Sequence, residues 1–295
     1  MFKLAFASCA KFQDQPQQPA WDDIRIQRPD ALLLLGDNIY LDHDHHGDPK
    51  VLGAELRQLY AQQFAVPSFK ALLNDMRDRH APVIAIYDDH DFLGNNRYGG
   101  DVDPSLRDAA RKEFVSAFNP VMTGPDVYAR YALGANNLID LIVLDERFYR
   151  TRPSDAGGDR NAILGAQQWD WFEQQVAQSQ ASYLVVASST TVHTFGDESW
   201  EQYPGAFQRL VKLLSKRRGA LVLTGDVHRN AAYDDSGLIE LVSSAVARNG
   251  IVFGAERRNF GMLTFDTQAV DVKLESLKAG WRFNFRIPLQ NWELP

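Results

Sequence analysis

The sequence has very little cysteine, since Cys9 is the single one among 295 residues. One cysteine cannot form an intrachain disulfide, so a secreted scaffold held together by disulfides is excluded. Only eight residues precede Cys9, which is too few for a charged start followed by an apolar stretch of about 7–15 residues, as a lipoprotein signal requires. Together these features predict a cytoplasmic protein.

The sequence also lacks long apolar runs and an excess of positive charge. Its longest apolar stretches, such as Ala31–Leu35, are far shorter than the roughly 20 residues that span a bilayer. Thirty-one Lys and Arg stand against 38 Asp and Glu, and the net charge of −7 opposes association with phosphate backbones. We therefore expect no membrane segment and no stable nucleic-acid partner. The sequence leaves the oligomeric state open.

Short apolar runs alternate with amphipathic segments along the first two-thirds of the chain. The apolar runs predict strands covered on both faces, at Phe2–Ala7, Ala31–Leu35, Pro82–Tyr87, Leu138–Leu144, Tyr183–Ala187 and Leu221–Thr224. The amphipathic segments predict helices at Val51–Phe64, Ser68–Arg77, Ser105–Phe118, Gln167–Gln178 and Phe207–Arg217. This order predicts a layered α/β fold with mostly parallel connections between strands.

The last part of the chain has a different pattern. Leu238–Val242, Met262–Phe265 and Val270–Leu277 are apolar or alternating, and turn residues rather than helices separate them. This pattern predicts an antiparallel meander that closes the sheet or builds a second one. Because no internal repeat or linker divides the chain, we predict a single domain over residues 1–295.

Polar and ionisable side chains follow five of the predicted strands, at the point where each strand ends. They are Ser8-Cys9, Gly36-Asp37-Asn38-Ile39-Tyr40, Asp88-Asp89-His90-Asp91, Asp145-Glu146-Arg147 and Gly225-Asp226-Val227-His228. A single aspartate after a strand often only caps a helix or turns the chain. Ligands of open α/β sheets bind beyond the carboxyl ends of the strands, so the five sets are expected to meet. Carboxylates at this density repel one another unless cations neutralise them, which predicts a metal site.

The types of side chain restrict the choice of metal. A thiolate from Cys9 and a phenolate from Tyr40 favour a strongly Lewis-acidic centre such as Fe(III) or zinc. A second, harder site of carboxylate and amide oxygens would suit calcium, magnesium or manganese. Asp37, which ends an apolar strand after a glycine, is well placed to bridge the two ions.

In this order, the motifs resemble those of the PhoD-like (alkaline phosphatase D) metallophosphatases, within the calcineurin-like metallophosphoesterase superfamily. The resemblance runs from residue 4 to about residue 245 and rests on Ser8-Cys9, Gly36–Tyr40, Asp88–Asp91 with Asn95-Asn96, Leu144–Arg147 and Gly225–His228. It implies a four-layer α/β/β/α sandwich of two mixed sheets flanked by helices. It also implies a phosphomonoesterase or phosphodiesterase that works by in-line attack of a metal-bound hydroxide.

The resemblance implies a set of metal ligands as well. It assigns Fe(III), with Ca²⁺ beside it, to Cys9, Asp37 and Tyr40, and it makes Asp226 and His228 further ligands. Zn²⁺, Mn²⁺ or Mg²⁺ are the alternatives. The remaining ligand of the second metal is open between three residues, which are Asp89, Asn95 and Asn96.

Other residues are expected to act on the substrate. With Asp37, His90 forms the predicted catalytic pair, because it occupies the place of a catalytic histidine that protonates the leaving oxygen or holds a phosphoryl oxygen. The predicted substrate-binding residues are Asn96, Arg107, Arg147 and His193. Arg147 has the alternative of pairing with Asp145 or another carboxylate, and His193 that of a satisfied histidine at a strand end. The run Asp42–His46 is interpreted as a solvated loop.

The sequence departs from the family pattern in two places. Secreted members carry a signal peptide and an N-terminal β-sandwich, whereas here the motifs begin at residue 4, so we expect no β-sandwich, no export and no role in phosphate scavenging. Asp88–Asp91 also ends in Asp where many members have Glu, and Phe92-Leu93-Gly94 separates it from Asn95-Asn96.

Two alternative functions remain. A metal-dependent hydrolase of other esters would keep the metal ligands but would not need the charge of Arg107. A non-catalytic relative would bind metal or a phosphorylated ligand without hydrolysing it.

Overall fold

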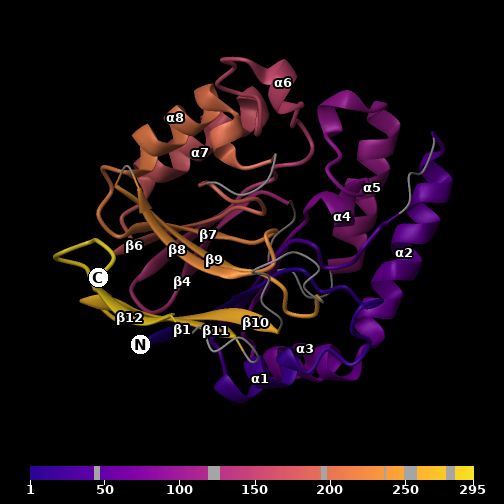
Figure 1. The fold of residues 1–295 in the computed structure, drawn as a ribbon. Helices are drawn as coiled ribbons and strands as arrows, with labels where there is room; N and C mark the ends of the chain where they lie inside the picture. Colours follow the sequence, from indigo (N-terminus) through magenta and orange to yellow (C-terminus); the bar gives the residue numbers. More distant parts are fainter. Residues whose placement is uncertain (43–46, 119–126, 194–197, 236, 249–257, 277–282) are drawn as a thin grey trace.

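Two six-stranded sheets lie face to face in the computed structural model (Figure 1). The structure describes residues 1–295 apart from 43–46, 119–126, 194–197, 236, 249–257 and 277–282. The strands of sheet A lie side by side in the order β12 (Phe283–Pro288), β11 (Ala269–Ser276), β10 (Asn259–Phe265), β1 (Phe2–Ala7), β2 (Ala31–Leu35) and β3 (Val83–Ile86). Those of sheet B follow the order β4 (Ala129–Leu133), β5 (Ile139–Val143), β6 (Tyr183–Ala187), β7 (Ala220–Thr224), β9 (Leu238–Ser243) and β8 (Asn230–Asp235).

Helices cover the outer face of each sheet (Figure 1). Sheet A is covered by α1 (Ala20–Gln27) and α3 (Pro67–Asp78), and sheet B by α7 (Gly165–Gln178) and α8 (Pro204–Leu214). A further group packs at one end of the sheets and consists of α2 (Pro49–Ala65), α4 (Asp89–Phe92) and α5 (Pro104–Phe118). Short helices include α6 (Pro153–Ala156), η1 (Gly99–Asp101) and η2 (Trp200–Gln202). The four-layer α/β/β/α prediction is confirmed.

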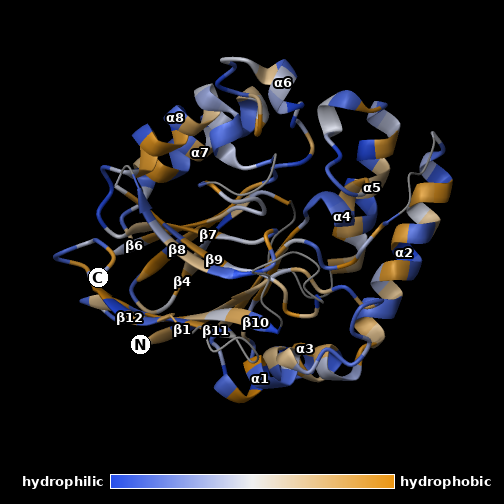
Figure 2. Ribbon diagram, viewed as in Figure 1, coloured by the Kyte–Doolittle hydropathy of each residue, from blue (hydrophilic) through white to orange (hydrophobic). Residues whose placement is uncertain are grey.

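Alternate residues of the inner strands fill two different apolar layers. Leu4 and Phe6 of β1 belong to the layer between the sheets, whereas Ala5 and Ala7 belong to the layer between sheet A and its helices. Figure 2 shows apolar residues along the strands and a mixture of apolar and polar residues on the helices. Because both faces are buried, such strands read as unbroken apolar runs. Each fully buried Leu or Phe contributes roughly 1.5–3 kcal/mol of transfer free energy.

The inner strands lie where the sequence predicts them, but the C-terminal pattern needs a correction. β10, β11 and β12 do form an antiparallel meander, and this meander extends sheet A from β1. β9, by contrast, pairs in parallel with β7 in sheet B, where Leu221 lies opposite Ile239. The reason is β8, which pairs antiparallel with β9 and carries the chain back along the sheet edge before β9 begins.

The strands that the sequence analysis missed all lie at sheet edges. β4, β8 and β12 each end a sheet, and most of their residues are partly or fully exposed. These three edge strands therefore lack the unbroken apolar run of a strand buried on both faces, whereas β3, at the other edge of sheet A, is fully buried and was predicted. The five predicted helices are present as α2, α3, α5, α7 and α8, with α8 ending at Leu214, before the predicted Arg217.

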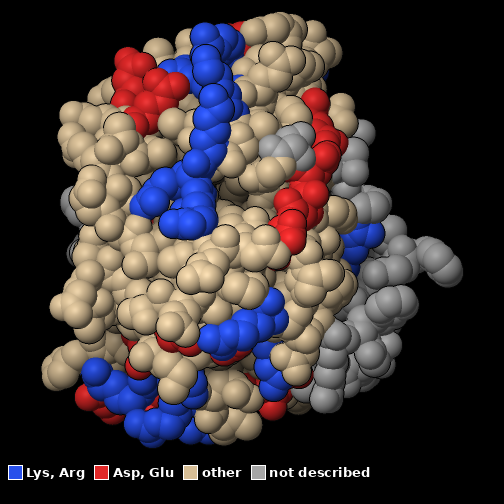
Figure 3. All heavy atoms as spheres, turned by 90° about the vertical axis from the view of Figure 1, so that its left-hand side faces the viewer, with Lys and Arg blue, Asp and Glu red and all other residues tan. Residues whose placement is uncertain are grey.

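The surface carries charges of both signs. On the face that Figure 3 shows, groups of Lys and Arg lie beside groups of Asp and Glu, with uncharged atoms between them. Such a mixed face does not create the single-sign potential that a continuous basic stripe creates. Among the helices of the described residues, none combines the length and the apolar character that a membrane span needs.

Gly261 offers a test of the packing between β1 and β10, where it lies opposite Phe6. A methyl group at Gly261 would overlap the fully buried Phe6 ring. We expect Gly261→Ala to lower the free energy of unfolding by about 1–3 kcal/mol, because the ring has to shift within a filled core. Denaturant unfolding followed by circular dichroism measures this. Gly158→Ala is the control, since nothing lies within 4 Å of its added methyl, and an equal loss in both variants would contradict the prediction.

Candidate metal centre

Side chains from both sheets meet beyond the carboxyl ends of their strands. Cys9 follows β1, Asp37 follows β2, Asp89 follows β3, and Asp226 and His228 follow β7. Backbone hydrogen bonds join the first two of these loops, because the Cys9 N–H donates to the Gly36 carbonyl at 3.3 Å and the Ala10 N–H donates to the Asp37 carbonyl at 2.8 Å. The sheets therefore bring together residues that are up to 219 positions apart, from Cys9 to His228.

Several of the predicted site residues adopt the left-handed backbone conformation. The φ angles are 61° at Cys9, 52° at Asp37, 53° at Asn96, 66° at Asp226 and 55° at His228. For residues other than glycine this conformation is uncommon and costs energy, and it is concentrated at functional sites. The strain therefore coincides with the turns that carry the candidate ligands.

A first group of ligand atoms comes from Cys9, Asp37 and His228, which offer one atom each within 4.8 Å of one another. The Cys9 thiol donates to Asp37 Oδ2 at 3.4 Å, and the Tyr40 hydroxyl donates to the same oxygen at 2.8 Å. The Tyr40 oxygen also lies 3.3 Å from His228 Nε2. Asp37 Oδ1 is buried and has no hydrogen-bond partner among the described residues. This carboxylate oxygen lies beside sulfur, phenol and imidazole donors, and together these groups could bind a metal ion.

A second group of ligand atoms comes from Asp37, Asp89 and His90, again within 4.8 Å of one another. Asp37 thus belongs to both groups, as a bridging ligand would. The Asp89 carboxylate accepts hydrogen bonds from the His90 N–H at 2.9 Å and the Asn96 N–H at 2.7 Å. Asp226 contributes its carbonyl oxygen, 3.8 Å from the Cys9 sulfur, and among the described residues its carboxylate belongs to neither group.

Burial and mutual repulsion control the protonation of these ligands. Burial, then the charges of Asp89 and Asp88, raise the pKa of Asp37 well above its ordinary value. Burial and the charge of Asp88 do the same to the pKa of Asp226. Burial together with the Asp37 charge raises the pKa of Cys9 and that of Tyr40. A bound cation reverses this effect, because it favours the ionised ligand.

His228 is held in the neutral form that binds metals. Burial, followed by the positive charge of Arg248, lowers its pKa to about 4. A neutral imidazole has an unshared pair on one nitrogen and needs no deprotonation before it binds a metal.

Arg147 lies beneath the centre and binds carboxylates. Its side chain is fully buried, with Nε 2.6 Å from Asp88 Oδ1 and with Nη1 and Nη2 at 3.0 and 2.9 Å from the two Glu198 oxygens. Burial acts to raise the pKa of Asp89, but the charges of Arg147 and His90 outweigh it and the pKa is lowered. Of the two roles considered for Arg147, the structure shows carboxylate pairing: all three guanidinium nitrogens contact carboxylates, and the side chain is fully buried.

His90 and the two asparagines lie on the open side of the centre. The His90 ring packs on Tyr40, with 4.2 Å between ring centroids, and its Nδ1 lies 3.5 Å from the Leu41 carbonyl oxygen and 3.6 Å from an Asp42 oxygen. Asn95 is exposed and donates to Asn96 Oδ1 at 3.2 Å. Of the three residues considered for the second metal, Asp89 contributes a carboxylate oxygen to the second group, and this carboxylate holds the backbone of Asn96 beside it.

The structure does not bring Arg107 or His193 into contact with the candidate ligands, as far as the described residues go. Arg107 belongs to helix α5, and its guanidinium lies 4.7 Å from the centre of the Phe148 ring. His193 Nδ1 pairs with Glu240 Oε2 at 2.9 Å. Of the run Asp42–His46, residues 43–46 lie outside the described residues, and Asp42 pairs with Lys11.

Two cations near Tyr40 escaped the sequence analysis. The Arg248 guanidinium lies 5.2 Å and the Lys11 ammonium 5.0 Å from the centre of the Tyr40 ring. Arg248 forms an ion pair with Asp14 at 2.7 Å, and its Nε is buried without a partner in the part of the chain that the structure describes. No motif marks Arg248, because it follows β9 and is close to the centre only in the folded chain.

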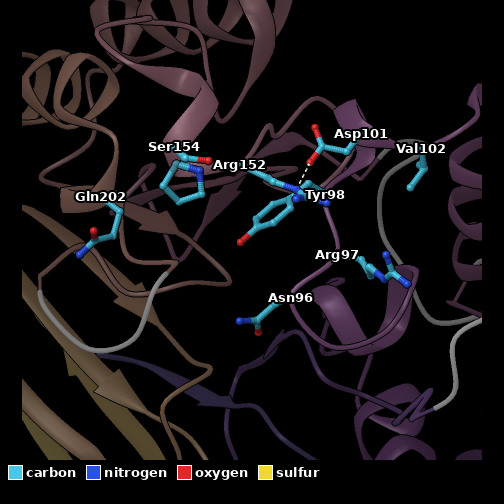
Figure 4. A pocket seen from close by; sticks show the side chains of 9 residues that line it. Asn96, Arg97, Tyr98, Asp101, Val102, Arg152, Ser154 and Gln202 are labelled. Atoms are coloured by element: carbon cyan, nitrogen blue, oxygen red, sulfur yellow. Dashed lines mark hydrogen bonds and ion pairs between the residues drawn. The ribbon is translucent and has the colours of Figure 1, made fainter.

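A pocket of about 420 Å³ adjoins the centre at Asn96. Figure 4 shows the Tyr98 hydroxyl and the Asn96 amide pointing toward the same space, with Gln202 across from them. Arg152 lies along the wall and is paired with Asp101 at 2.9 Å. The pocket thus offers an aromatic ring and uncharged polar groups, with Arg97 and the Arg152–Asp101 pair also in its lining.

Comparison with known proteins shows which family the chain belongs to. The structure entitled "Structure of PhoD" has a TM-score of 0.77 and 20% identity, and the match covers 99% of this chain and 71% of that one. The GAP50 anchor in the inner membrane complex of Plasmodium has a TM-score of 0.60 and 12% identity, with 99% and 89% coverage. Comparison with curated protein sequences gave no match. The family model described as PhoD-like phosphatase matches residues 4–273, and the chain therefore belongs to the PhoD-like phosphatases, enzymes of metal-dependent phosphate-ester hydrolysis.

Proposed function

We propose that this chain hydrolyses phosphate esters at the centre around Asp37, acting as one catalytic unit over residues 1–295. The observation that carries the proposal is the place of Asp37 in two overlapping groups of ligand atoms. One ion would be held by Asp37 with Cys9, Tyr40 and His228. The second would be held by Asp37, Asp89 and Asp226, together with an amide oxygen of Asn95 or Asn96.

The donor sets support different metals at the two positions. Sulfur, phenol, imidazole and carboxylate donors suit Fe(III), with Zn²⁺ as the alternative. The oxygen-rich set suits Ca²⁺, with Mg²⁺ or Mn²⁺ as alternatives. When bound, such a pair supplies Lewis acidity to the phosphoryl oxygens and lowers the pKa of an attacking water. A compartment that keeps thiols reduced, such as the cytoplasm, would preserve the Cys9 ligand.

The remaining steps fall to side chains of the protein. His90 would donate a proton from Nε2 to the leaving oxygen, while Nδ1 faces the Leu41 carbonyl oxygen and the Asp42 carboxylate, which orient the ring. Asp42 also balances the charge of the ring when both nitrogens carry protons. Arg248 would face a non-bridging phosphoryl oxygen, because its guanidinium lies beside Tyr40 and its buried Nε has no partner among the described residues.

The pocket beside Asn96 suggests where the alcohol part of the ester lies. Tyr98 offers an aromatic face, and Gln202 and Asn96 offer amide groups that bind neutral polar atoms. A pocket of about 420 Å³ is large enough for a sugar or an aryl group. The pocket could therefore bind the alcohol group of an organic phosphate ester. It has room for a monoester and for the second substituent of a diester.

Two alternatives are a non-catalytic protein that only binds metal or a phosphorylated ligand, and a hydrolase of other esters. GAP50 is described as an anchor and shares the fold, so the fold alone does not imply catalysis. Here the thiol, phenol, imidazole and carboxylates lie together at the centre, which supports a catalytic role. An activity on uncharged esters would not need the Arg248 cation beside Tyr40.

The central test is the loss of the shared ligand. We expect Asp37→Asn to remove bound metal and to abolish hydrolysis of 4-nitrophenyl phosphate and bis(4-nitrophenyl) phosphate, as chelation of the wild type should. Metal analysis and a visible spectrum are recorded on the same samples, because phenolate or thiolate bound to Fe(III) gives an intense charge-transfer band. Asp78→Asn is the control, since its side chain is 71% exposed. Full activity after exhaustive chelation would refute the proposal, and a colourless active enzyme would exclude Fe(III).

His90 is tested through the leaving group. We expect His90→Asn to lower kcat for an alkyl phosphate by about 10²–10⁴-fold, because an alkoxide needs the proton. The loss for 4-nitrophenyl phosphate should be much smaller, since nitrophenolate leaves without one. Steady-state kinetics on both substrates measures the difference, with His80→Asn, at an exposed position, as the control. Equal losses on both substrates would assign His90 to positioning and not to proton donation.

Arg248 and Arg107 are distinguished by matched variants. We expect Arg248→Gln to lower kcat/KM for phosphate monoesters by about 10²-fold, because one charged donor to the phosphoryl oxygens is lost. Arg107→Gln should change it little, since that guanidinium packs on Phe148. Kinetics of the two variants on one substrate decides between them, and the reverse ranking would restore the original expectation for Arg107.

A further inference from the structure

A second group of potential ligands lies at the edge of sheet B. His193, Glu201 and Asp235 offer one ligand atom each within 4.8 Å of one another. They come from the segment after β6, from η2 and from the last residue of β8. Asp226 and His228 precede β8, so the new group lies at the opposite end of that strand from the catalytic centre.

His193 is prepared as a ligand by a buried carboxylate. Its side chain is 4% exposed, and its Nδ1 lies 2.9 Å from Oε2 of the fully buried Glu240. Because an ionised carboxylate only accepts hydrogen bonds, Nδ1 carries the proton of the neutral ring. Nε2 then has the unshared pair, and it is buried without a hydrogen-bond partner in the described structure.

Glu240 itself is held firmly in place. It also accepts hydrogen bonds from the backbone N–H groups of Val192 and His193, at 2.8 and 2.9 Å, and from Thr224 Oγ1 at 2.7 Å. A carboxylate that fixes the tautomer and direction of a histidine is the usual outer partner of a metal-bound imidazole. Glu240 therefore plays the supporting role, while Nε2 remains for the ligand.

A metal ion at this group would give the unshared pair on His193 Nε2 a partner. A proton on Nε2 would need an acceptor at hydrogen-bond distance, and Nε2 has none among the described residues. The exposed Asp235 and half-buried Glu201 side chains can close donors that lie within 4.8 Å of one another onto an ion about 2.0–2.2 Å from each donor. The carboxylates of Glu201 and Asp235 carry two negative charges, which a divalent cation balances.

We propose that His193, Glu201 and Asp235 bind a divalent metal, with Zn²⁺ as the best match for one imidazole and two carboxylates. Asp235 is exposed and Glu201 is half-buried, so the ion can enter from solvent. The ion ties η2 and the segment after β6 to the edge strand β8. The role is structural: it stabilises the edge of sheet B and takes no part in the hydrolysis.

The test titrates metal-free protein with Zn²⁺ alone, in the wild type and in variants at each site. We expect one Zn²⁺ per chain to persist in Asp37→Asn, which disables the catalytic centre, and to disappear in both Asp235→Asn and Glu201→Gln. Calorimetry gives the stoichiometry, and circular dichroism confirms that each variant is folded. Asp234→Asn is the matched control, because it is next along the strand and keeps its acceptor for the Leu294 N–H.

A second readout separates this proposal from the catalytic one. Zn²⁺ should raise the melting temperature of Asp37→Asn but not of an Asp37→Asn/Asp235→Asn double variant. Phosphatase activity of Asp235→Asn should equal that of the wild type. The proposal is overturned if Asp235→Asn and Glu201→Gln keep the Zn²⁺ stoichiometry of the wild type. It is also overturned if Asp37→Asn binds no Zn²⁺.

Discussion

The repulsion between buried carboxylates around Asp37 is the constraint on which the rest of the centre depends. Asp37, Asp88 and Asp89 are at most 3% exposed, and the negative charges of the last two add to burial in raising the pKa of Asp37. Arg147 supplies one positive charge, which it divides between Asp88, Glu198 and, at 3.9 Å, Asp89. One charge cannot balance so many carboxylates, so their ionised form requires further cations, and bound metal ions supply them.

The packing energy of a large apolar core offsets the repulsion between these carboxylates. Three apolar layers, one between the sheets and one beneath each helix layer, hold the strands rigidly. The strained left-handed residues lie in the short loops directly after those strands, as Cys9 and Asp37 do. A short loop between fixed ends has few other conformations, so the packing energy of the strands can offset the strain and the repulsion.

Much of this could be predicted from the sequence because the signals are local. An inner strand buried on both faces reads as an unbroken apolar run, and the residues after parallel strands meet at one edge of the sheet. These two rules were enough to predict that Cys9, Asp37, Asp89 and His228 lie together. The edge strands β4, β8 and β12 escaped because a half-exposed strand has no such run, and without β8 the parallel position of β9 could not be foreseen.

The arginines and His193 show why the rest could not be predicted. An arginine near a cluster of carboxylates either neutralises the cluster from inside or faces the substrate from outside, and the sequence motif is the same in both cases. Burial distinguishes the two arginines of this centre. The Arg147 side chain is 0% exposed and surrounded by acids, whereas that of Arg248 is 14% exposed and lies beside Tyr40. His193 follows a strand as a site residue would, but its segment turns away from the centre to Glu240, which is 47 residues distant in the chain. Such choices depend on tertiary contacts that no local pattern encodes.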